Sequence, residues 1–448
     1  MTEDDDEKPD RRYRSVPSSR AARLGAFGRL AGGVAGGVLG EGARRMVRGE
    51  RPRMRDLLLT PGNIGRVTER LSHLRGAAMK MGQMISMDAG DLLPPELSEI
   101  LAQLRSQAHR MPPAQLRDVL DAEWGRDWRT RFARFDATPI AAASIGQVHR
   151  AVLPDGRELA IKVQYPGVRE SIDADVDNVA TLLRMTGALP RELDLAPLLA
   201  EAKRQLREEA DYEREAAQMT RFADLLEGDP RYRVPRPAPE LTTARALAMD
   251  YLVGRPIEEL ESQPQDVRDA AMRDLIALVL REMFEFGAMQ TDPNFANYRY
   301  DPESRQLILL DFGAARDVDP PTAESYRAIM RAGLSGDPDT VRELCVEAGF
   351  IGRTAVERHR ALIDRMIGII VTEMNRPGPF DIGDRAFVVT LREQGMEMAA
   401  DRTTWHVPPV ETLFVQRKIS GTALLAARMK ARVDVRELVR PYLENICA

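Results

Sequence analysis

One stretch, residues 289–316, constrains this chain more than any other. It contains Asp292 and Asn297 in a D-x-x-x-x-N arrangement. A short hairpin is predicted next, because turn-forming residues at 301–304 separate two strand-like segments. The second strand leads into Asp311, the first residue of the tripeptide DFG. We therefore expect two oxygen donors, Asn297 and Asp311, at the two chain ends of one rigid hairpin.

Oxygen donors in this order are typical of enzymes that transfer phosphoryl groups. Mg²⁺ takes hard oxygen ligands and must be held against the β- and γ-phosphates of a nucleotide. In kinases a base or positioning aspartate, a metal-binding asparagine, a strand and the DFG aspartate follow one another along the chain. DFG alone could be a turn at the end of a strand, but Asp292 and Asn297 at kinase spacing favour the catalytic interpretation.

Composition argues against several other classes of protein. A net charge of −5 provides no basic excess for binding nucleic acid. The two cysteines, Cys345 and Cys447, and five scattered histidines predict neither a disulfide framework nor a thiolate metal site. No apolar run reaches the length of a membrane span, and no signal-peptide pattern opens the chain. We expect a cytoplasmic protein, with peripheral contact at the inner face of the membrane left open.

The N-terminal 55 residues divide into two parts. Residues 1–20 are charged and carry prolines and serines, so we expect them to be disordered. In residues 24–40 a glycine recurs every four positions and arginines lie on both sides. A flexible linker, an interfacial helix on an anionic membrane and a true membrane span all remain open for this segment.

A helical extension is predicted over residues 56–125. Apolar residues recur at helical spacing, and the motif Lys80-x-Gly82-Gln83 lies in the middle of one helix. A glycine inside a helix costs about 1 kcal/mol relative to alanine. Gly82 therefore indicates the close approach of another backbone.

Residues 135–163 predict a strand, a tight loop, a second strand, a turn and a third strand. The loop, residues 139–149, takes the place of a kinase glycine-rich loop, with alanines instead of most of the glycines. Its backbone N–H groups can still face phosphate oxygens. The predicted contacts are Ala141, Ala142, Ala143 and Ser144. Lys162 on the third strand matches the lysine that pairs with the α- and β-phosphates, although a strand lysine is more often only solvated.

One long, charged helix is predicted over residues 194–226. Glu215 is the candidate for the carboxylate that holds Lys162, and Glu209 and Asp211 form an E-x-D pair one to two turns earlier. A strand-like segment at 246–252 is expected to meet the adenine through its backbone, near Asp250 and Leu252. An apolar helix follows over residues 267–287, and helices continue after residue 316, with breaks at 375–379 and 407–409.

Taken together, these motifs resemble the UbiB/AarF-type atypical kinases over roughly residues 55–435. The family supports coenzyme Q biosynthesis. Many bacterial members carry histidine two residues before the catalytic aspartate, where this chain has Gln290, and the form Q-T-D-P-N is similar to the mitochondrial-type branch. The resemblance rests on five motifs in order: K-x-G-Q, the alanine-rich loop, E-x-D with Glu215, Asp292 with Asn297, and DFG.

The resemblance implies a role for each matching residue. Lys162, held by Glu215, contacts the nucleotide phosphates, and Asp292 is the catalytic-loop aspartate. Asn297 and Asp311 hold Mg²⁺. Lys80 and Gln83 fold over the site, meet Glu209 and Asp211, and block protein substrates. The likeness also raises the expectation that residues 24–40 touch a membrane.

The expected fold is α+β: a bilobal protein-kinase-like fold with a small antiparallel-sheet N-lobe and a helical C-lobe. The predicted domains are 1–55, an N-terminus that could associate with membrane; 56–125, the helical extension; 126–253, the N-lobe; and 254–448, the C-lobe. ATP and Mg²⁺ are the expected cofactors, bound between the lobes. A small-molecule or lipid acceptor, such as a quinone precursor, is the expected partner, and a homodimer is compatible with the sequence.

Three functions compete. The first is an ATP-dependent phosphotransferase or ATPase, favoured by the complete set of motif residues. The second is a nucleotide-gated binding or chaperone module, a pseudokinase for a lipid or an enzyme complex, favoured by the glycine-poor loop and the covering extension. A conventional protein kinase is the weakest, because no A-P-E segment follows Asp311 and a helical pattern resumes soon after Pro321.

Overall fold

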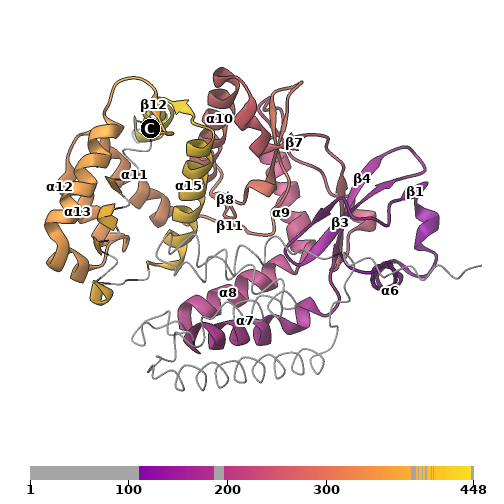
Figure 1. The fold of residues 1–448 in the computed structure, drawn as a ribbon. Coiled ribbons are helices and arrows are strands. Elements are labelled where there is room, and N and C mark those ends of the chain that lie inside the picture. The colour runs from indigo at the N-terminus through magenta and orange to yellow at the C-terminus, as the bar shows by residue number, and fades with distance from the viewer. Residues whose placement is uncertain are drawn as a thin grey trace, which may run out of the picture. The chain divides into compact units, whose positions relative to one another are not determined.

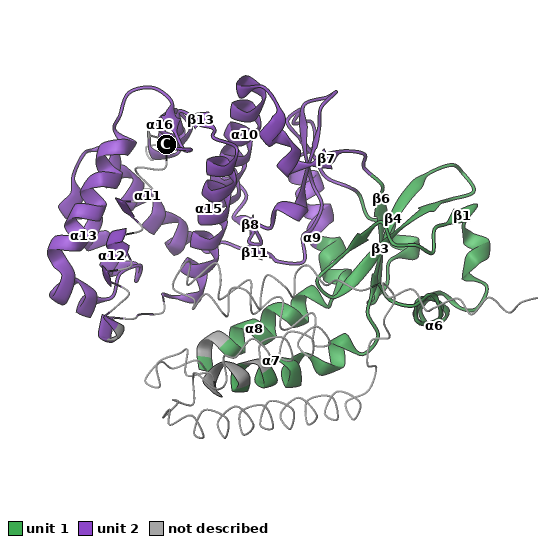
Figure 2. Cartoon of the chain, in the orientation of Figure 1, with its two compact units in different colours: residues 1–217, 236–251 green, residues 218–235, 252–448 purple. Residues whose placement is uncertain are grey.

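The computed structural model describes residues 110–185, 196–384 and 390–444, with gaps at 392, 396, 399–400, 405 and 407. The chain divides into two compact units (Figure 2). Unit 1 contains the described residues up to Ala217 and residues 236–251, and unit 2 contains residues 218–235 and the described residues from Leu252 onward. The glycine-rich segment 24–40 and the K-x-G-Q motif lie outside the described residues.

A small antiparallel sheet forms the centre of unit 1 (Figure 1). Its order is β1-β3-β4-β6, and β2 also pairs with β3. In β4, Leu159, Ile161 and Val163 are fully buried, as expected for a strand rich in branched side chains. The strands predicted in residues 135–163 are therefore confirmed. The strands are β1 (Arg134–Phe135), β2 (Ala141–Ala142), β3 (Gly146–Val152), β4 (Glu158–Gln164) and β6 (Ala246–Asp250).

Helices accompany this sheet, and α7 and α8 pack side by side (Figure 1). The prediction of one unbroken helix over residues 194–226 was wrong. The chain breaks at Ala210 and Asp211, because the Asp211 carboxylate accepts a hydrogen bond from the Arg214 N–H at 3.1 Å and begins a new helix. The helices are α6 (Pro113–Trp124), α7 (Val168–Met185), α8 (Ala196–Glu209) and α9 (Tyr212–Leu225), with short 3-10 turns η2 (Trp128–Arg131) and η3 (Pro239–Leu241).

His149 on β3 is completely buried in unit 1. Its Nδ1 lies 2.8 Å from the Asp136 carbonyl oxygen, and its Nε2 lies 2.9 Å from Gln147 Nε2. Gln147 Oε1 accepts from the Met111 N–H, so the amide presents its NH₂ group to the histidine. A neutral ring with Nδ1 protonated satisfies both neighbours, whereas a charged ring would place two donors face to face. Burial lowers the pKa of His149 to about 4, and the Asp136 hydrogen bond opposes this only in part.

We expect acid to destabilise unit 1 through this histidine. Its pKa is 6.5 in the unfolded chain and about 4 in the folded protein. Between pH 6.5 and 4, therefore, the unfolded chain binds a proton at this residue and the folded protein does not. Unfolding free energy should fall by roughly 3 kcal/mol as the pH drops from 6.5 to 4. Urea unfolding at several pH values should show a shallower decline for His149→Asn. An equal decline in both proteins would contradict this assignment.

Unit 2 holds the predicted hairpin inside a second sheet, whose order is β5-β10-β9-β7. The hairpin strands are antiparallel and in register from Tyr298 opposite Leu309 to Asp301 opposite Gln306, which confirms the predicted turn. Two further pairs are β8 with β11 and β12 with β13. The strands are β5 (Tyr232–Arg233), β7 (Arg255–Pro256), β8 (Ala288–Gln290), β9 (Tyr298–Asp301), β10 (Gln306–Leu309), β11 (Ala315–Asp317), β12 (Phe380–Asp381) and β13 (Arg432–Val433).

Helices make up the rest of unit 2, with α10 at its centre (Figure 1). Buried residues lie on most sides of α10, and α15 and α16 pack against it. Asp319 caps α11 by accepting from the Thr322 N–H at 3.1 Å. The described residues include no helix long and apolar enough to span a membrane. The helices are α10 (Gln265–Phe284), α11 (Pro320–Leu334), α12 (Pro338–Glu347), α13 (Arg353–Met374), α15 (Val410–Arg428) and α16 (Val435–Glu444), with 3-10 turns η4 (Ile257–Ser262), η5 (Phe295–Asn297) and η6 (Arg402–Thr404).

Candidate catalytic site

The β9–β10 hairpin places Asn297 and Asp311 at the same end of the sheet. Tyr298, the first residue of β9, lies opposite Leu309, the last residue of β10. One position further out, the Leu310 N–H donates to the Asn297 carbonyl oxygen at 3.0 Å. Asp311 is the next residue, so the two strands bring the chain segments that carry Asn297 and Asp311 to the same end of the hairpin.

Hydrogen bonds hold Asp292 in the loop before this hairpin. Its carbonyl oxygen accepts from Asn297 Nδ2 at 3.1 Å and from Gln290 Nε2 at 3.0 Å. The neighbouring Thr291 hydroxyl donates to the Ala314 carbonyl oxygen at 2.7 Å. The loop is thereby tied to the segment after DFG. Asn297 uses its NH₂ group on the loop, which leaves its Oδ1 as the atom suited to a cation.

The two residues that follow Asp311 anchor the DFG segment. The Gly313 N–H donates to Asp311 Oδ1 at 3.0 Å, which fixes the carboxylate over its own turn. Phe312 is fully buried, and its ring packs against Phe222 of α9 with 4.9 Å between ring centroids. This aromatic contact holds the backbone that carries the carboxylate.

Lys162 and Glu215 form a buried ion pair in unit 1. Lys162 Nζ lies 2.8 Å from Glu215 Oε1 and 2.9 Å from Oε2, and the side chains are 4% and 0% exposed. The ammonium also lies 5.1 Å from the centroid of the Tyr212 ring. The solvated-lysine interpretation of Lys162 does not hold, because this side chain is enclosed. Its role toward phosphate stays a prediction.

The alanine-rich loop has less free backbone than predicted. Ala141 and Ala142 pair with β3, and the Ala143 N–H donates to the Gly146 carbonyl oxygen at 2.9 Å. That N–H group is therefore already used within the loop. The Ser144 hydroxyl donates to Glu209 Oε1. This hydrogen bond ties the loop to Glu209, the residue of the E-x-D motif that ends α8.

The remaining predicted residues occupy varied positions. Glu209 is buried at the end of α8, and Asp211 caps α9. Asp250 ends β6, where its backbone N–H donates to the Arg236 carbonyl oxygen, and Leu252 begins the return to unit 2. Lys80 and Gln83 lie outside the described residues.

The structure thus assembles two groups of predicted residues. Lys162, Glu215, Ser144 and Glu209 belong to unit 1, and the Asp292, Asn297 and Asp311 group belongs to unit 2. Among the described residues, no group of three or more histidine, cysteine or acidic side chains is arranged as a metal site. A cation at the hairpin would therefore take one carboxylate and one amide from the protein, and oxygens from a bound phosphate or water would complete its shell.

Sequence reasoning missed a buried lysine next to this site. Lys418 on α15 is completely buried and contacts Glu282, Gln290 and Tyr298. Its partners lie more than a hundred positions away in sequence, and no local motif marks it. The sequence itself shows only a charged residue within a largely apolar segment, 412–427.

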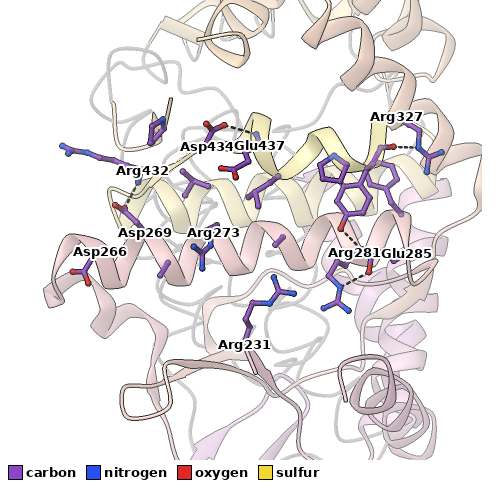
Figure 3. Close-up of a pocket in the computed structure, with 18 residues that line it drawn as sticks. Arg231, Asp266, Asp269, Arg273, Arg281, Glu285, Arg327, Arg432, Asp434 and Glu437 are labelled. Carbon is purple, nitrogen blue, oxygen red and sulfur yellow. Dashed lines mark hydrogen bonds and ion pairs between the residues drawn. The ribbon is translucent and has the colours of Figure 1, made fainter. Parts of the chain in front are cut away.

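A cavity of about 930 Å³ opens elsewhere in unit 2, between α10 and α16 (Figure 3). None of the predicted site residues lines it. Its charged side chains partly satisfy one another, as where Arg281 Nε lies 2.9 Å from Glu285 Oε2. The lining holds as many arginines as acids, so its formal charges balance. The charged lining residues are Arg231, Asp266, Asp269, Arg273, Arg281, Glu285, Arg327, Arg432, Asp434 and Glu437.

A model of the ABC1 atypical kinase-like domain matches residues 103–345. That range contains Lys162, Glu215, Asp292, Asn297 and Asp311.

Characterised relatives match nearly the whole chain. Atypical kinase COQ8B, mitochondrial, of Rattus norvegicus is 38% identical over 429 residues, which cover 95% of this chain and 81% of that protein. Atypical kinase COQ8, mitochondrial, of Saccharomyces cerevisiae is 37% identical over 432 residues, covering 95% and 85%. Among solved structures, Rv3197 of Mycobacterium tuberculosis, in complex with erythromycin, superposes with a TM-score of 0.60 at 26% identity, covering 86% of this chain and 96% of that one.

Proposed function

This chain belongs to the ABC1 atypical kinase-like family, and from that premise we propose that it binds ATP with Mg²⁺ and transfers the γ-phosphoryl group to water or a small acceptor. The UbiB/AarF-type resemblance of the motifs is confirmed, and the relatives are of the mitochondrial type. The α+β fold is protein-kinase-like, and the chain is an atypical kinase whose acceptor stays open.

One observation supports the proposal: the hairpin register pairs Asn297 with Leu310, the residue directly before Asp311. An amide oxygen and a carboxylate supplied from one end of a hairpin suit Mg²⁺, which is bound in nucleotide enzymes by few protein ligands and by the substrate phosphates. Asn297 and Asp311 would hold the metal, which would supply neutralisation of the charge on the transferred phosphoryl group. Asp292, in the loop tied to Asn297, is proposed to orient the attacking hydroxyl or water and to accept its proton.

Lys162 is proposed to bind the α- and β-phosphates. An enclosed ammonium that Glu215 holds by both carboxylate oxygens has a fixed position, so little conformational entropy is lost when phosphate binds. The chemistry then rests on positioning and charge neutralisation, without a covalent intermediate.

The biological role is proposed from the relatives. Two relatives that match most of the chain are mitochondrial COQ8-type atypical kinases, so we propose a role in ubiquinone or another isoprenoid quinone pathway, with a small-molecule or lipid acceptor. For this chain we propose a cytoplasmic site of action, with the segment 24–40 in peripheral contact with the inner face of a membrane. Quinone profiling of a deletion strain tests this role, and an unchanged profile would contradict it.

The second candidate, a nucleotide-gated binding module, is favoured by the alanine-rich loop. Since the Ala143 N–H is already bound to Gly146, the loop offers fewer donors to a γ-phosphate than a glycine-rich loop does. Such a protein would bind nucleotide and turn it over only incidentally.

Phosphate release and thermal shift, measured on one preparation, decide between the two. The atypical kinase should release phosphate from ATP with Mg²⁺, and EDTA should stop the release. A thermal shift with Mg·ATP but no release, even with liposomes present, would favour the binding module. Neither a shift nor release would contradict both.

A further inference from the structure

Lys418 brings a positive charge to the interior of unit 2, directly behind the loop that carries Asp292. Its side chain and that of Glu282 are each 1% exposed. Its Nζ lies 3.2 Å from Glu282 Oε2, 3.3 Å from Gln290 Oε1 and 3.0 Å from the Tyr298 hydroxyl. The enclosed ammonium therefore has one oxygen neighbour for each of its three N–H groups.

Two of these partners bracket the catalytic loop. Gln290 is the last residue of β8, and Tyr298 is the first residue of β9. The loop 291–297 therefore begins and ends at side chains that meet on one ammonium group. Glu282 contributes to the same attachment, because its Oε1 accepts from the Gln290 N–H at 3.3 Å.

The Gln290 side chain connects this attachment to Asp292. Gln290 accepts from Lys418 with its Oε1, so its NH₂ group must face the other way. There it donates to the Asp292 carbonyl oxygen at 3.0 Å, the same atom that Asn297 Nδ2 contacts. The lysine thus determines which end of the Gln290 amide faces the loop.

We propose that Lys418 is a positioning residue for phosphoryl transfer: by fixing Gln290 and Tyr298 it holds the loop that presents Asp292 and Asn297. It touches neither nucleotide nor metal. The inference rests on the proposed function and adds a part of the machinery on α15, beyond the matched family domain at residues 103–345.

The charge on Lys418 is maintained by its surroundings. Burial alone would lower its pKa, but attraction to Glu282 and Tyr298 outweighs this, and the pKa stands above the usual value for lysine. Removing the lysine alone would leave the Glu282 carboxylate buried without its cation, which can unfold a protein. The test therefore has to remove both charges together.

The main experiment uses Glu282→Gln with Lys418→Met, which keeps the side-chain volumes and leaves no buried charge. In this double variant we expect kcat for ATP hydrolysis to fall by about 10- to 100-fold. KM for ATP should stay within about threefold, because Lys162 and Asp311 are untouched. Assays run well below the melting temperature separate this effect from a loss of folded protein.

Arg342→Met is the matched control. Arg342 is another buried cation of unit 2, with a side chain 7% exposed that lies 2.6 Å from Asp339 and 2.7 Å from Asp364. Its loss should lower the melting temperature and leave kcat unchanged. Lys418→Arg keeps the charge and its hydrogen-bond donors. This variant should therefore retain part of the activity that the variant with methionine at position 418 loses.

Hydrogen exchange gives a readout that does not depend on turnover. Peptides covering residues 288–300 should exchange faster in the double variant, while peptides from α12 and α13 should not change. If the wild-type protein fails to hydrolyse ATP, the proposed function is wrong. The loop attachment is tested separately: exchange in residues 288–300 that stays as slow in the double variant as in wild type would overturn it. If the double variant does not fold, Tyr298→Phe decides, with a three- to tenfold fall in kcat expected.

Two kinetic results would also overturn the inference. One is a folded double variant whose kcat lies within twofold of wild type, whatever its exchange rate. The other is a fall in activity that appears entirely in KM for ATP, which would place Lys418 in nucleotide binding instead.

Discussion

Asp311→Asn should reduce Mg²⁺-dependent ATP turnover by at least about 10³-fold, since a metal ligand supplies several kcal/mol of charge stabilisation and each 1.4 kcal/mol is tenfold in rate. The fold should survive, because asparagine keeps the Oδ1 that accepts from the Gly313 N–H. Steady-state phosphate release across a Mg²⁺ titration measures the effect. Part of the loss should reappear as a higher Mg²⁺ requirement.

Asp337→Asn is the matched control for this change. Asp337 is an exposed acid of unit 2 that caps α12 by accepting from the Thr340 N–H at 3.0 Å. Asparagine caps helices about as well as aspartate, so both stability and turnover should stay near wild type. Unchanged turnover in Asp311→Asn would remove Asp311 from the metal site and leave the proposal without its central ligand.

The Lys162–Glu215 pair should show the largest effect on stability. Glu215→Gln leaves an ammonium, and Lys162→Met leaves a carboxylate, in a site where the two side chains are 4% and 0% exposed. Breaking one half of a buried ion pair costs about 3–5 kcal/mol. We expect each single variant to lose that much unfolding free energy and to lose ATP turnover as well.

The double variant separates folding from function at this pair. With both charges removed, unfolding free energy should recover to within about 2 kcal/mol of wild type, because a buried pair is often replaceable by neutral groups. Turnover should not recover, because no ammonium remains for the phosphates. Urea unfolding and phosphate release on the four proteins complete the cycle. Recovery of both properties would show that Lys162 does not bind the nucleotide.

The parts of the site that could be predicted are those set by local spacing. The turn at 301–304 between two strand-forming segments determines the hairpin, and hairpin register then determines where Asn297 and Asp311 lie. Lys162 could be found because it follows a predicted loop and turn on a strand. Glu215 could be named as the candidate carboxylate on the charged helix that follows, and the structure places it within hydrogen-bond distance of that lysine.

Two features could not be predicted, for different physical reasons. The break at Ala210–Asp211 was missed because strong helix formers continue on both sides, and only the capping hydrogen bond of Asp211 reveals it. The Lys418 cluster was missed because its contacts join residues 120 to 136 positions apart, a relationship that no periodicity encodes. The role of residues 24–40 stays a prediction.

The β9–β10 hairpin also determines which changes of length the chain can tolerate. Residues 302–305 at its tip are exposed, so an inserted peptide or a fluorescent label there leaves the opposite end in place. Deleting a single residue from either strand is different, because a one-residue shift turns every following side chain to the other face of the sheet. The number of residues between Asn297 and Asp311 is therefore as much a part of the proposed magnesium site as the two side chains themselves.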